Sequence, residues 1–399
     1  NRVPFVYEER EYFKNKIIYY ETSRGCPFSC SYCLSSIDKT VRFRSLDLVL
    51  PELQFFLDHK VPQVKFVDRT FNCKRDHTLG IWRYLVEHDN GITNFHFEVS
   101  ADIFDEEELE LIGKMRPGLI QLEIGVQSTN PDTIKEIHRH MDLVKLKQAV
   151  DRVYDYRNTH QHLDLIAGLP YEDIKSFRKS FDDVYSMRPD QLQLGFLKVL
   201  TGSYMAEKTQ DYGLLYHQEP PYEVLATKWL DYGQVLRLKA VEDMVEVHYN
   251  SGQYTETLRE MEQHWASPYA MFEALADYYE RLGYTGIAIN RLTRYEILFG
   301  FLQETEPEKT ERYRDLLTYD LYLRENSKSR PVWAKDPIGK SDDPKIREKI
   351  SDFYRREAEE HRYLHYDEKY QARQLMHMTH LEQFHDGTWV LFDYGRRDP

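Results

Sequence analysis

Three cysteines stand close together in the segment RGCPFSCSYC, residues 24–33. The spacing CxxxCxxC brings the thiolates of Cys26, Cys30 and Cys33 to one point, and no fourth cysteine stands close by. Iron-sulfur carriers commonly cap every iron of a cubane cluster with a cysteine, so three thiolates suit a 4Fe-4S cluster with one iron left open. An open iron needs a ligand from outside the protein, and that ligand can be a substrate.

The same segment has two alternative interpretations, a zinc site and a chance group of thiols in a buried turn. A structural zinc ion takes four protein ligands, and zinc motifs normally combine one CxxC with a second pair. The nearest histidine, His59, lies too far along the chain to be a local fourth ligand. The spacing therefore favours the iron-sulfur cluster, with Cys26, Cys30 and Cys33 as its metal ligands.

An aromatic residue, Tyr32, directly precedes the third cysteine. With it, the segment resembles the signature of the radical S-adenosylmethionine (SAM) superfamily. The resemblance implies that the amino and carboxylate groups of SAM bind the open iron. It also implies that one electron from the cluster splits SAM into methionine and a 5′-deoxyadenosyl radical, with Tyr32 facing the adenine.

Strand-like and helix-like stretches alternate from residue 17 to residue 198, which is the pattern of repeated βα units. Six strands are predicted, at residues 17–21, 63–68, 94–99, 119–126, 162–167 and 191–199. Five helical periods separate them, at residues 46–59, 79–88, 105–115, 142–157 and 174–187. The fold class is therefore α/β, a partial TIM-type (βα)6 barrel whose chemistry lies on the loops after the strands. The cysteine segment follows the first strand.

Polar residues share one face of the third and fourth predicted strands, namely His96, Glu98, Gln121, Glu123, Gly125 and Gln127. Because helices cover the outside of such a barrel, this face is expected to point inward. Buried acids are costly to leave unpaired. The cationic groups and ribose of SAM would satisfy Glu98 and Glu123; the alternative is structural ion pairs with Arg69 or Lys198.

Two strand ends also resemble radical SAM motifs, GVQS at residues 125–128 and DLIAGLP at residues 164–170. The resemblance implies that Glu98 or Glu123 binds the ribose, and it makes Gln127 a further cofactor-binding candidate. The backbone near Ile166 is expected to face the adenine. The family's usual GGE is replaced by VDRTFN at residues 67–72, where Asp68, Arg69 and Thr70 are assigned to the SAM amino group.

The fourth cysteine, Cys73, follows the second predicted strand and is expected to point over the same barrel mouth. As a catalytic candidate it could donate a hydrogen atom to a substrate radical or bind a second metal. The alternative is a free thiol packed in a loop as a small hydrophobic group.

The 399 residues are enough for one large domain and a smaller one, which we predict as residues 17–204, the barrel, and 205–399, a mostly helical domain with a terminal β-hairpin. Helices are predicted there at residues 222–241, 268–282, 286–302 and 307–324. Residues 1–16 are expected to be a linker from a missing upstream domain. That arrangement resembles the cobalamin-linked branch of the superfamily, which includes anaerobic magnesium-protoporphyrin ester cyclases and B12-dependent methyltransferases. Cobalamin, held by the upstream domain, is thus a candidate third cofactor.

A net charge of −14 without a basic cluster argues against a nucleic-acid substrate. The absence of a signal peptide or a long apolar stretch predicts a cytoplasmic protein that does not contact a membrane. We therefore expect a radical SAM enzyme that acts on a small molecule by methyl transfer, cyclisation or oxidation, with a reducing partner such as flavodoxin or ferredoxin. The alternatives are a non-catalytic iron-sulfur electron carrier or scaffold and a zinc-binding interaction protein.

Overall fold

A computed structural model of the chain describes residues 5–7, 13 and 15–395. The expected linker, residues 1–16, lies largely outside the described residues. The chain divides into two compact units, residues 1–246 and 247–399. No helix of the described part is long and apolar enough to cross a membrane.

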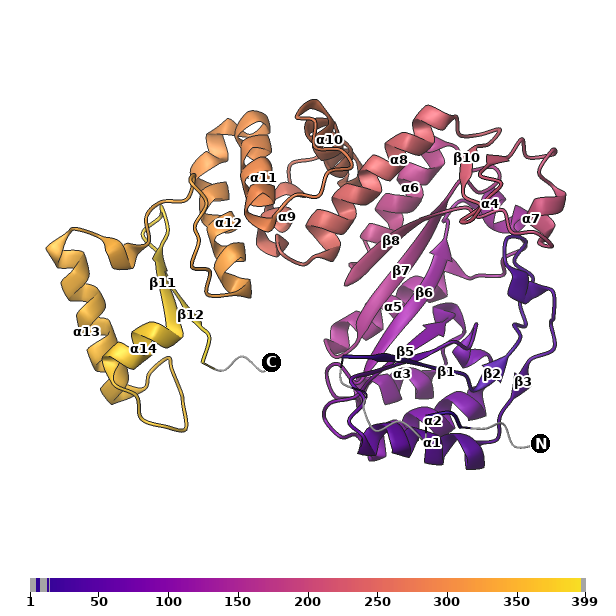
Figure 1. Cartoon of the computed structure of the whole chain (residues 1–399), viewed down its shortest axis with the longest axis horizontal. Coiled ribbons are helices and arrows are strands. Elements are labelled where there is room, and N and C mark those ends of the chain that lie inside the picture. The colour runs from indigo at the N-terminus through magenta and orange to yellow at the C-terminus, as the bar shows by residue number, and fades with distance from the viewer. Residues whose placement is uncertain (1–4, 8–12, 14, 396–399) are drawn as a thin grey trace. The chain divides into compact units, whose positions relative to one another are not determined.

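A sheet of six parallel strands forms the centre of the first unit (Figure 1). In spatial order the strands are β1 (Ile17–Tyr20), β4 (Gln63–Phe66), β5 (Asn94–Val99), β6 (Ile120–Gln127), β7 (His160–Ala167) and β8 (Gln191–Phe196). Their order follows the chain, as successive right-handed βα units require. The predicted partial barrel is therefore confirmed, and its six strands occupy the predicted stretches.

The two faces of the sheet differ in chemistry because side chains alternate along each strand. In β6, Leu122 and Ile124 are buried on one face, whereas Glu123 and Gln127 are partly exposed on the other. Register pairs Glu98 of β5 with Glu123 of β6, so the acids of neighbouring strands lie side by side. This arrangement gathers the polar residues on the concave face.

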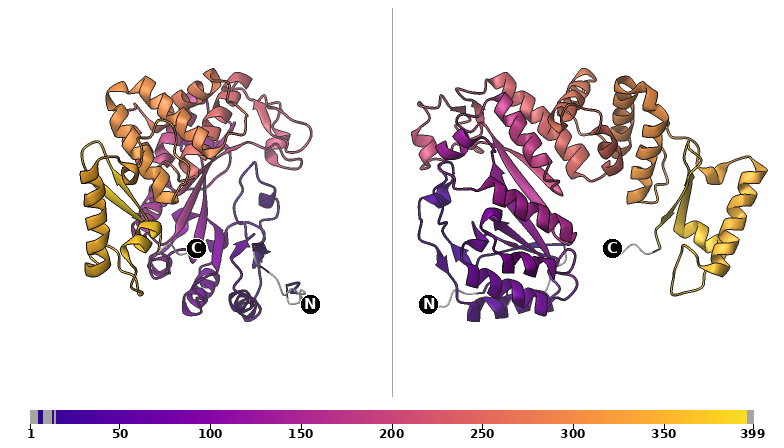
Figure 2. Two further views of the ribbon diagram at one scale, coloured as in Figure 1. Left: turned by 60° about the vertical axis from the view of Figure 1, so that its left-hand side comes forward. Right: turned by 180° about the vertical axis from the view of Figure 1, so that it is seen from behind.

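Helices cover the apolar face of the sheet, as the views from two sides show (Figures 1 and 2). They are α1 (Leu46–Asp58), α2 (Arg75–Glu87), α3 (Glu106–Gly113), α5 (Leu143–Tyr156) and α6 (Ile174–Tyr185). An aspartate caps the amino end of three of them: Asp105 accepts from Glu108 N at 2.9 Å, Asp142 from Val144 N at 3.0 Å and Asp173 from Ser176 N at 2.8 Å. These caps fix where each loop after a strand ends.

Shorter elements surround the carboxyl ends of the strands. They are β2 (Ser23–Arg24), β3 (Arg42–Phe43), the 3₁₀ turns Leu34–Ser36, Phe71–Cys73 and Ala101–Ile103, α4 (Pro131–Glu136) and α7 (Tyr204–Glu207). β2 and β3 pair antiparallel and close the loop that carries the three cysteines. The unit ends with β9 (Leu215–Tyr216), β10 (Val224–Ala226) and α8 (Tyr232–Met244).

The helix predicted at residues 222–241 is wrong in its first half. β10 pairs with β9 there, and α8 begins only at Tyr232. The start of α8 is set by a capping box, in which Asp231 accepts from Gln234 N at 2.8 Å while the Gln234 side chain accepts from Asp231 N at 3.0 Å.

The second unit is mostly helical. The π-helical turn Val245–Asn250 follows α8 and continues into this unit. The helices of the unit are α9 (Thr255–Met261), α10 (Pro268–Arg281), α11 (Arg291–Thr305), α12 (Thr310–Arg324), α13 (Pro344–Glu360) and α14 (Ala372–Met378). It also contains the 3₁₀ turns Pro307–Lys309 and Ile338–Lys340. The predicted terminal hairpin is present as β11 (Thr379–Gln383) and β12 (Trp389–Asp393). Ile350, Tyr354, Leu364 and Leu375 form a small core beside this hairpin.

Candidate functional site

The cysteine loop begins with a glycine that a larger residue cannot replace. Gly25 has a φ of 102°, and a Cβ placed there would lie 2.5 Å from the carbonyl oxygen of Thr40. Beyond it, Cys33 N donates to the Cys30 carbonyl at 3.1 Å, and Ser31 N donates to the carbonyl of Ile137 at 2.9 Å. These bonds hold the loop against the segment that follows α4.

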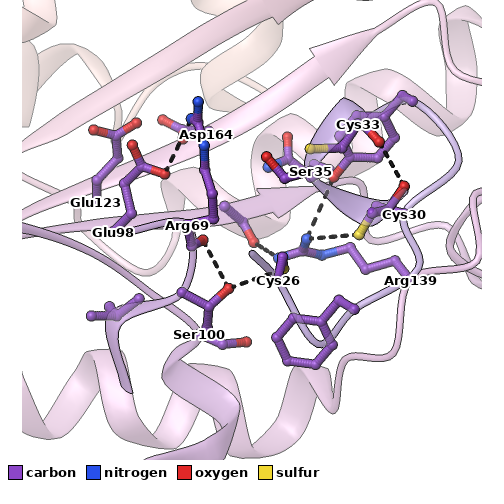
Figure 3. Close-up of a pocket in the computed structure, with 17 residues that line it drawn as sticks. Cys26, Cys30, Cys33, Ser35, Arg69, Glu98, Ser100, Glu123, Arg139 and Asp164 are labelled. Carbon is purple, nitrogen blue, oxygen red and sulfur yellow. Dashed lines mark hydrogen bonds and ion pairs between the residues drawn. The ribbon is translucent and has the colours of Figure 1, made fainter. Parts of the chain in front are cut away.

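A cavity of about 230 Å³ lies at the carboxyl ends of the strands (Figure 3). Its lining includes all three cysteines of the loop and many of the side chains predicted for SAM binding. The predicted residues on its wall are Cys26, Cys30, Tyr32, Cys33, Arg69, Thr70, Glu98, Glu123 and Gln127. Asp68, Cys73 and Ile166 are not part of this wall. The barrel thus brings together residues that are up to about a hundred positions apart in sequence.

The three thiols offer the soft donors that an iron-sulfur cluster requires. All three cysteines are free of disulfides and face the same cavity (Figure 3). The Cys26 Sγ lies 3.6 Å from the hydroxyl of Thr70, and the Cys30 Sγ lies 3.8 Å from Arg139 Nη1. Among the described residues no three cysteine, histidine or acidic side chains form a closed metal site. Three thiols of one loop on one cavity wall nevertheless fit a cluster that spans several ångströms.

Sequence reasoning missed Arg139, a basic residue at the centre of this wall. Its guanidinium donates to the Tyr32 hydroxyl at 3.4 Å and to the carbonyl of Gly125. Burial raises the pKa of the Tyr32 phenol, while the charge of Arg139 opposes that rise. Arg139 follows the GVQS motif by eleven positions and carries no periodic signal, so only the fold reveals its place beside Cys30.

The two predicted acids have opposite protonation behaviour. Burial and the charge of Glu123 raise the pKa of Glu98 to about 7. The pKa of Glu123 falls to about 2, mainly because of its contact with His96, since Nε2 of that ring lies 2.9 Å from Glu123 Oε2. Lys65 Nζ lies 3.0 Å from the same oxygen. Glu123 is thus a fixed negative charge, whereas Glu98 can gain or lose a proton near neutral pH.

The alternative is that ion pairs with Arg69 or Lys198 neutralise these acids. Of these two residues, only Arg69 approaches one of the acids in the part of the chain that the structure describes. Arg69 Nη1 lies 4.0 Å from Glu98 Oε2, and its side chain is 56% exposed. Glu123 instead pairs with Lys65, a residue that sequence reasoning did not select.

Asp164 of the DLIAGLP motif also reaches the cavity. Its Oδ1 lies 3.0 Å from Nε2 of His162. Burial lowers the pKa of His162, but the contact with Asp164 and the charge of Glu123 together raise it more, so the net shift is upward. Burial raises the pKa of Asp164 itself. The cavity therefore has three carboxyl groups along one side, from Glu98, Glu123 and Asp164.

Gln127 ends β6 in a left-handed conformation, with a φ of 72°. The residue is part of the cavity lining, and its Oε1 is buried and has no hydrogen-bond partner within the described protein. Buried acceptors are rarely left without a donor. A ligand that donates a hydrogen bond, such as an amino or hydroxyl group of SAM, would satisfy this oxygen.

Three predicted site residues lie elsewhere. The Asp68 carboxylate is fully buried and accepts from Thr22 N at 3.0 Å and from the Thr22 hydroxyl at 2.8 Å, so it ties β4 to the loop after β1. Ile166 follows Asp164 on the same face of β7, beyond the cavity wall. Cys73 ends a 3₁₀ turn, and burial together with the nearby Cys26 raises the pKa of its thiol to about 11.

The chain matches two protein families. Residues 20–184 match the radical SAM superfamily, and residues 210–390 match a family described as a protein of unknown function, DUF4080. The first match covers β4 to β7 of the sheet and the cysteine loop; the second begins shortly after α7.

Curated relatives match up to about half of the chain. The cobalamin-dependent radical SAM methyltransferase TokK of Streptomyces tokunonensis is 27% identical over 208 residues, which are 49% of this chain and 30% of that protein. Bacteriochlorophyllide d C-12(1)-methyltransferase of Chlorobaculum tepidum is 26% identical over 204 residues, 47% of this chain and 42% of that protein. The oxygen-independent coproporphyrinogen III oxidase of Paracoccus denitrificans is 28% identical over 100 residues, 25% of this chain and 22% of that protein. The chain spans less than half the length of each.

Solved structures give weaker likenesses. The radical SAM methyltransferase TsrM of Kitasatospora setae aligns with a TM-score of 0.44 at 17% identity, over 51% of this chain and 38% of that one. Coproporphyrinogen III oxidase (HemN) of Escherichia coli aligns with a TM-score of 0.40 at 16% identity, over 57% and 53%. The sequence matches carry more weight, and they confirm both the predicted family and the likeness to its cobalamin-linked branch. Residues 20–184 thus form a radical SAM domain, and the cofactors of that superfamily are a 4Fe-4S cluster and SAM.

Proposed function

We propose that Cys26, Cys30 and Cys33 hold the 4Fe-4S cluster and that SAM occupies the cavity beside it. One observation carries this proposal: three thiols, a buried guanidinium and three carboxyl groups line a single cavity at the carboxyl ends of the strands. When bound, the cluster supplies the electron that splits SAM into methionine and a 5′-deoxyadenosyl radical.

The charges of the wall match the charges of SAM. Arg139, the cation beside the thiols, would bind the SAM carboxylate through charge-assisted hydrogen bonds. The ionised Glu123, with Glu98, would attract the sulfonium and accept from the ribose hydroxyls. Gln127 Oε1 offers an acceptor for the amino group. Arg69 and Thr70 complete the wall next to Cys26. Asp68 serves this site from outside, because its carboxylate fixes the loop after β1 through Thr22.

The radical would then act on a small molecule by methyl transfer, cyclisation or oxidation. Methyl transfer has the support of TokK and the bacteriochlorophyllide methyltransferase, and oxidation that of the coproporphyrinogen oxidases. We propose cobalamin, from an upstream domain, as the additional cofactor if methyl transfer is the reaction. We also propose a cytoplasmic location, a flavodoxin or ferredoxin as reductant and, for Cys73, hydrogen-atom donation to the substrate radical.

The test is anaerobic reconstitution of the cluster, followed by addition of SAM and dithionite and chromatography for 5′-deoxyadenosine and methionine. We expect both products from the wild-type protein and neither from Cys30→Ala. A full cluster whose electron paramagnetic resonance spectrum does not change with SAM, and which yields neither product, would instead identify an electron carrier or scaffold.

A further inference from the structure

A second hollow, of about 890 Å³, lies on the outer surface of the first unit, between α4 and the start of α5. Its lining is mainly apolar and comes from a short stretch of chain, Pro131, Ile134, Met141, Leu143 and Val144. Val144 is 67% exposed. This small apolar group, on a protein with a net charge of −14, is a candidate interaction surface.

Basic side chains surround the apolar residues of this hollow. Lys135, His138 and His140 are exposed at its edge, and none of them forms an ion pair with a residue that the structure describes. The lining has one acid, Asp142, whose carboxylate caps α5 and keeps its negative charge. Lys135 and Arg139 outnumber this acid, and the two histidines add charge only when protonated, so the hollow carries a small positive charge on an acidic protein. This favours an acidic partner and disfavours a second copy of this chain.

The hollow lies directly behind the cysteine loop. Ser29, which stands between Cys26 and Cys30, is part of its lining. Arg139 lines both this hollow and the inner cavity, with its guanidinium 3.8 Å from the Cys30 Sγ. The backbone bond of 2.9 Å from Ser31 N to the Ile137 carbonyl links the same two segments. A redox centre placed in the hollow would thus be separated from Cys30 by little more than one side chain.

We propose that this hollow is the docking surface for an acidic one-electron carrier protein with an exposed flavin or iron-sulfur centre. The inference rests on the proposed cluster at Cys26, Cys30 and Cys33. In each encounter the carrier would be oxidised by one electron and the cluster reduced by one, and no bond to either protein would form. A small apolar centre with a charged rim is typical of such transient redox contacts.

The experiment measures the rate of cluster reduction in the full chain, by anaerobic stopped-flow, with photoreduced flavodoxin and separately with dithionite. The test variant is Lys135→Glu/His140→Glu, and Val144→Asp is a second variant that leaves the basic rim unchanged. Lys114→Glu is the matched control, since Lys114 is an exposed lysine at the end of α3, near the opposite ends of the strands. All these positions are exposed, so the fold should tolerate the changes.

We expect flavodoxin to reduce the double variant about tenfold more slowly than wild type at low salt, with the difference shrinking at high salt. Val144→Asp should also be slow, and Lys114→Glu should match wild type within about twofold. Dithionite should reduce all four proteins at the same rate. Equal flavodoxin rates in wild type and both test variants, or an equal loss in Lys114→Glu, would overturn the docking surface. Lack of SAM cleavage by a dithionite-reduced wild-type cluster would overturn the proposed function instead, and the flavodoxin rates would still decide the docking site.

Discussion

The guanidinium of Arg139 lies 3.8 Å from the sulfur of Cys30, although the two residues are 109 positions apart in the sequence. The same side chain reaches Tyr32 and the carbonyl of Gly125 at the end of β6. Arg139 therefore connects the cysteine loop after β1 to the carboxyl end of β6, which lies three strands away from β1 in the sheet. It also places a positive charge next to a proposed cluster ligand.

Replacement of this charge should weaken SAM binding. We expect Arg139→Gln to lose about tenfold to a hundredfold in SAM affinity, since a hydrogen bond to a charged group contributes about 1.5–3 kcal/mol. The midpoint potential of the cluster should also become more negative. Arg139→Lys keeps the charge but not the planar fork and should fall between the two proteins. Calorimetry and a redox titration followed by electron paramagnetic resonance measure these effects; unchanged SAM affinity in Arg139→Gln would contradict the assigned role.

Cluster assembly should depend on three cysteines and not on the fourth. Cys26→Ala, Cys30→Ala and Cys33→Ala each remove one ligand, so reconstituted protein should lose most of its iron and sulfide. Cys73→Ala is the matched control, because Cys73 does not line the cavity and its thiol is held protonated by a pKa of about 11. Iron and sulfide analysis decides the matter. A full, SAM-responsive cluster in Cys30→Ala would exclude the proposed ligand set.

Much of this arrangement follows from local sequence patterns. The strict alternation in residues 120–127 predicts both β6 and the face on which Glu123 and Gln127 lie. The spacing of the cysteines predicts that one loop supplies three thiols. Signals of this kind depend on near neighbours in the chain, which is why they can be read without a structure.

The contacts that the sequence did not predict join segments that are distant in the chain. Asp68 has the side chain and the sequence position expected of a ligand-binding acid, yet Thr22 donates hydrogen bonds to both of its carboxylate oxygens. Lys65 lies on a strand where a basic residue has no obvious role, and only parallel pairing through β5 brings it to Glu123. Tertiary pairing of this kind decides which acids remain available to a ligand.

Binding of SAM should depend on pH through Glu98. Because burial and Glu123 raise the pKa of Glu98 from 4.5 to about 7, the carboxyl gains its charge only as the pH rises through neutrality. Affinity for the cationic SAM should therefore increase between about pH 6 and pH 8, and Glu98→Gln should lack the part of this increase that the carboxyl causes. Isothermal calorimetry at several pH values compares the two proteins. Identical pH profiles would show that Glu98 does not face the ligand.

The raised pKa of Glu98 has the opposite pH effect on the stability of the protein without SAM. The folded state binds the Glu98 proton more tightly than the unfolded chain, so the stabilising contribution is complete below about pH 4.5 and is lost as the pH rises through about 7. Glu98→Gln should remove this dependence from the free energy of unfolding, as urea titrations at pH 5 and pH 8 would measure.

Glu123 should contribute both to the stability of the fold and to the binding of SAM. Glu123→Leu leaves Lys65 without its partner at 3.0 Å and should destabilise the protein by about 1–3 kcal/mol. The double variant Lys65→Met/Glu123→Leu removes both charges and should recover most of that stability. SAM affinity should remain low in both, with the cluster intact. Recovery of SAM affinity in the double variant would mean that Glu123 only neutralises Lys65.

The glycine before the first cysteine should be needed for the cluster loop and not for the barrel. Gly25 and Gly91 both have positive φ values, 102° and 72°, so alanine is strained at either position by about 1–2 kcal/mol. Only at Gly25 does the new Cβ also meet backbone, at 2.5 Å from the Thr40 carbonyl, whereas nothing lies within 4 Å at Gly91. Gly25→Ala must therefore shift the loop that carries Cys26. We expect it to retain the circular dichroism spectrum but lose cluster iron, while Gly91→Ala keeps a full cluster. Equal iron content in the two variants would show that the cysteine loop tolerates the displacement.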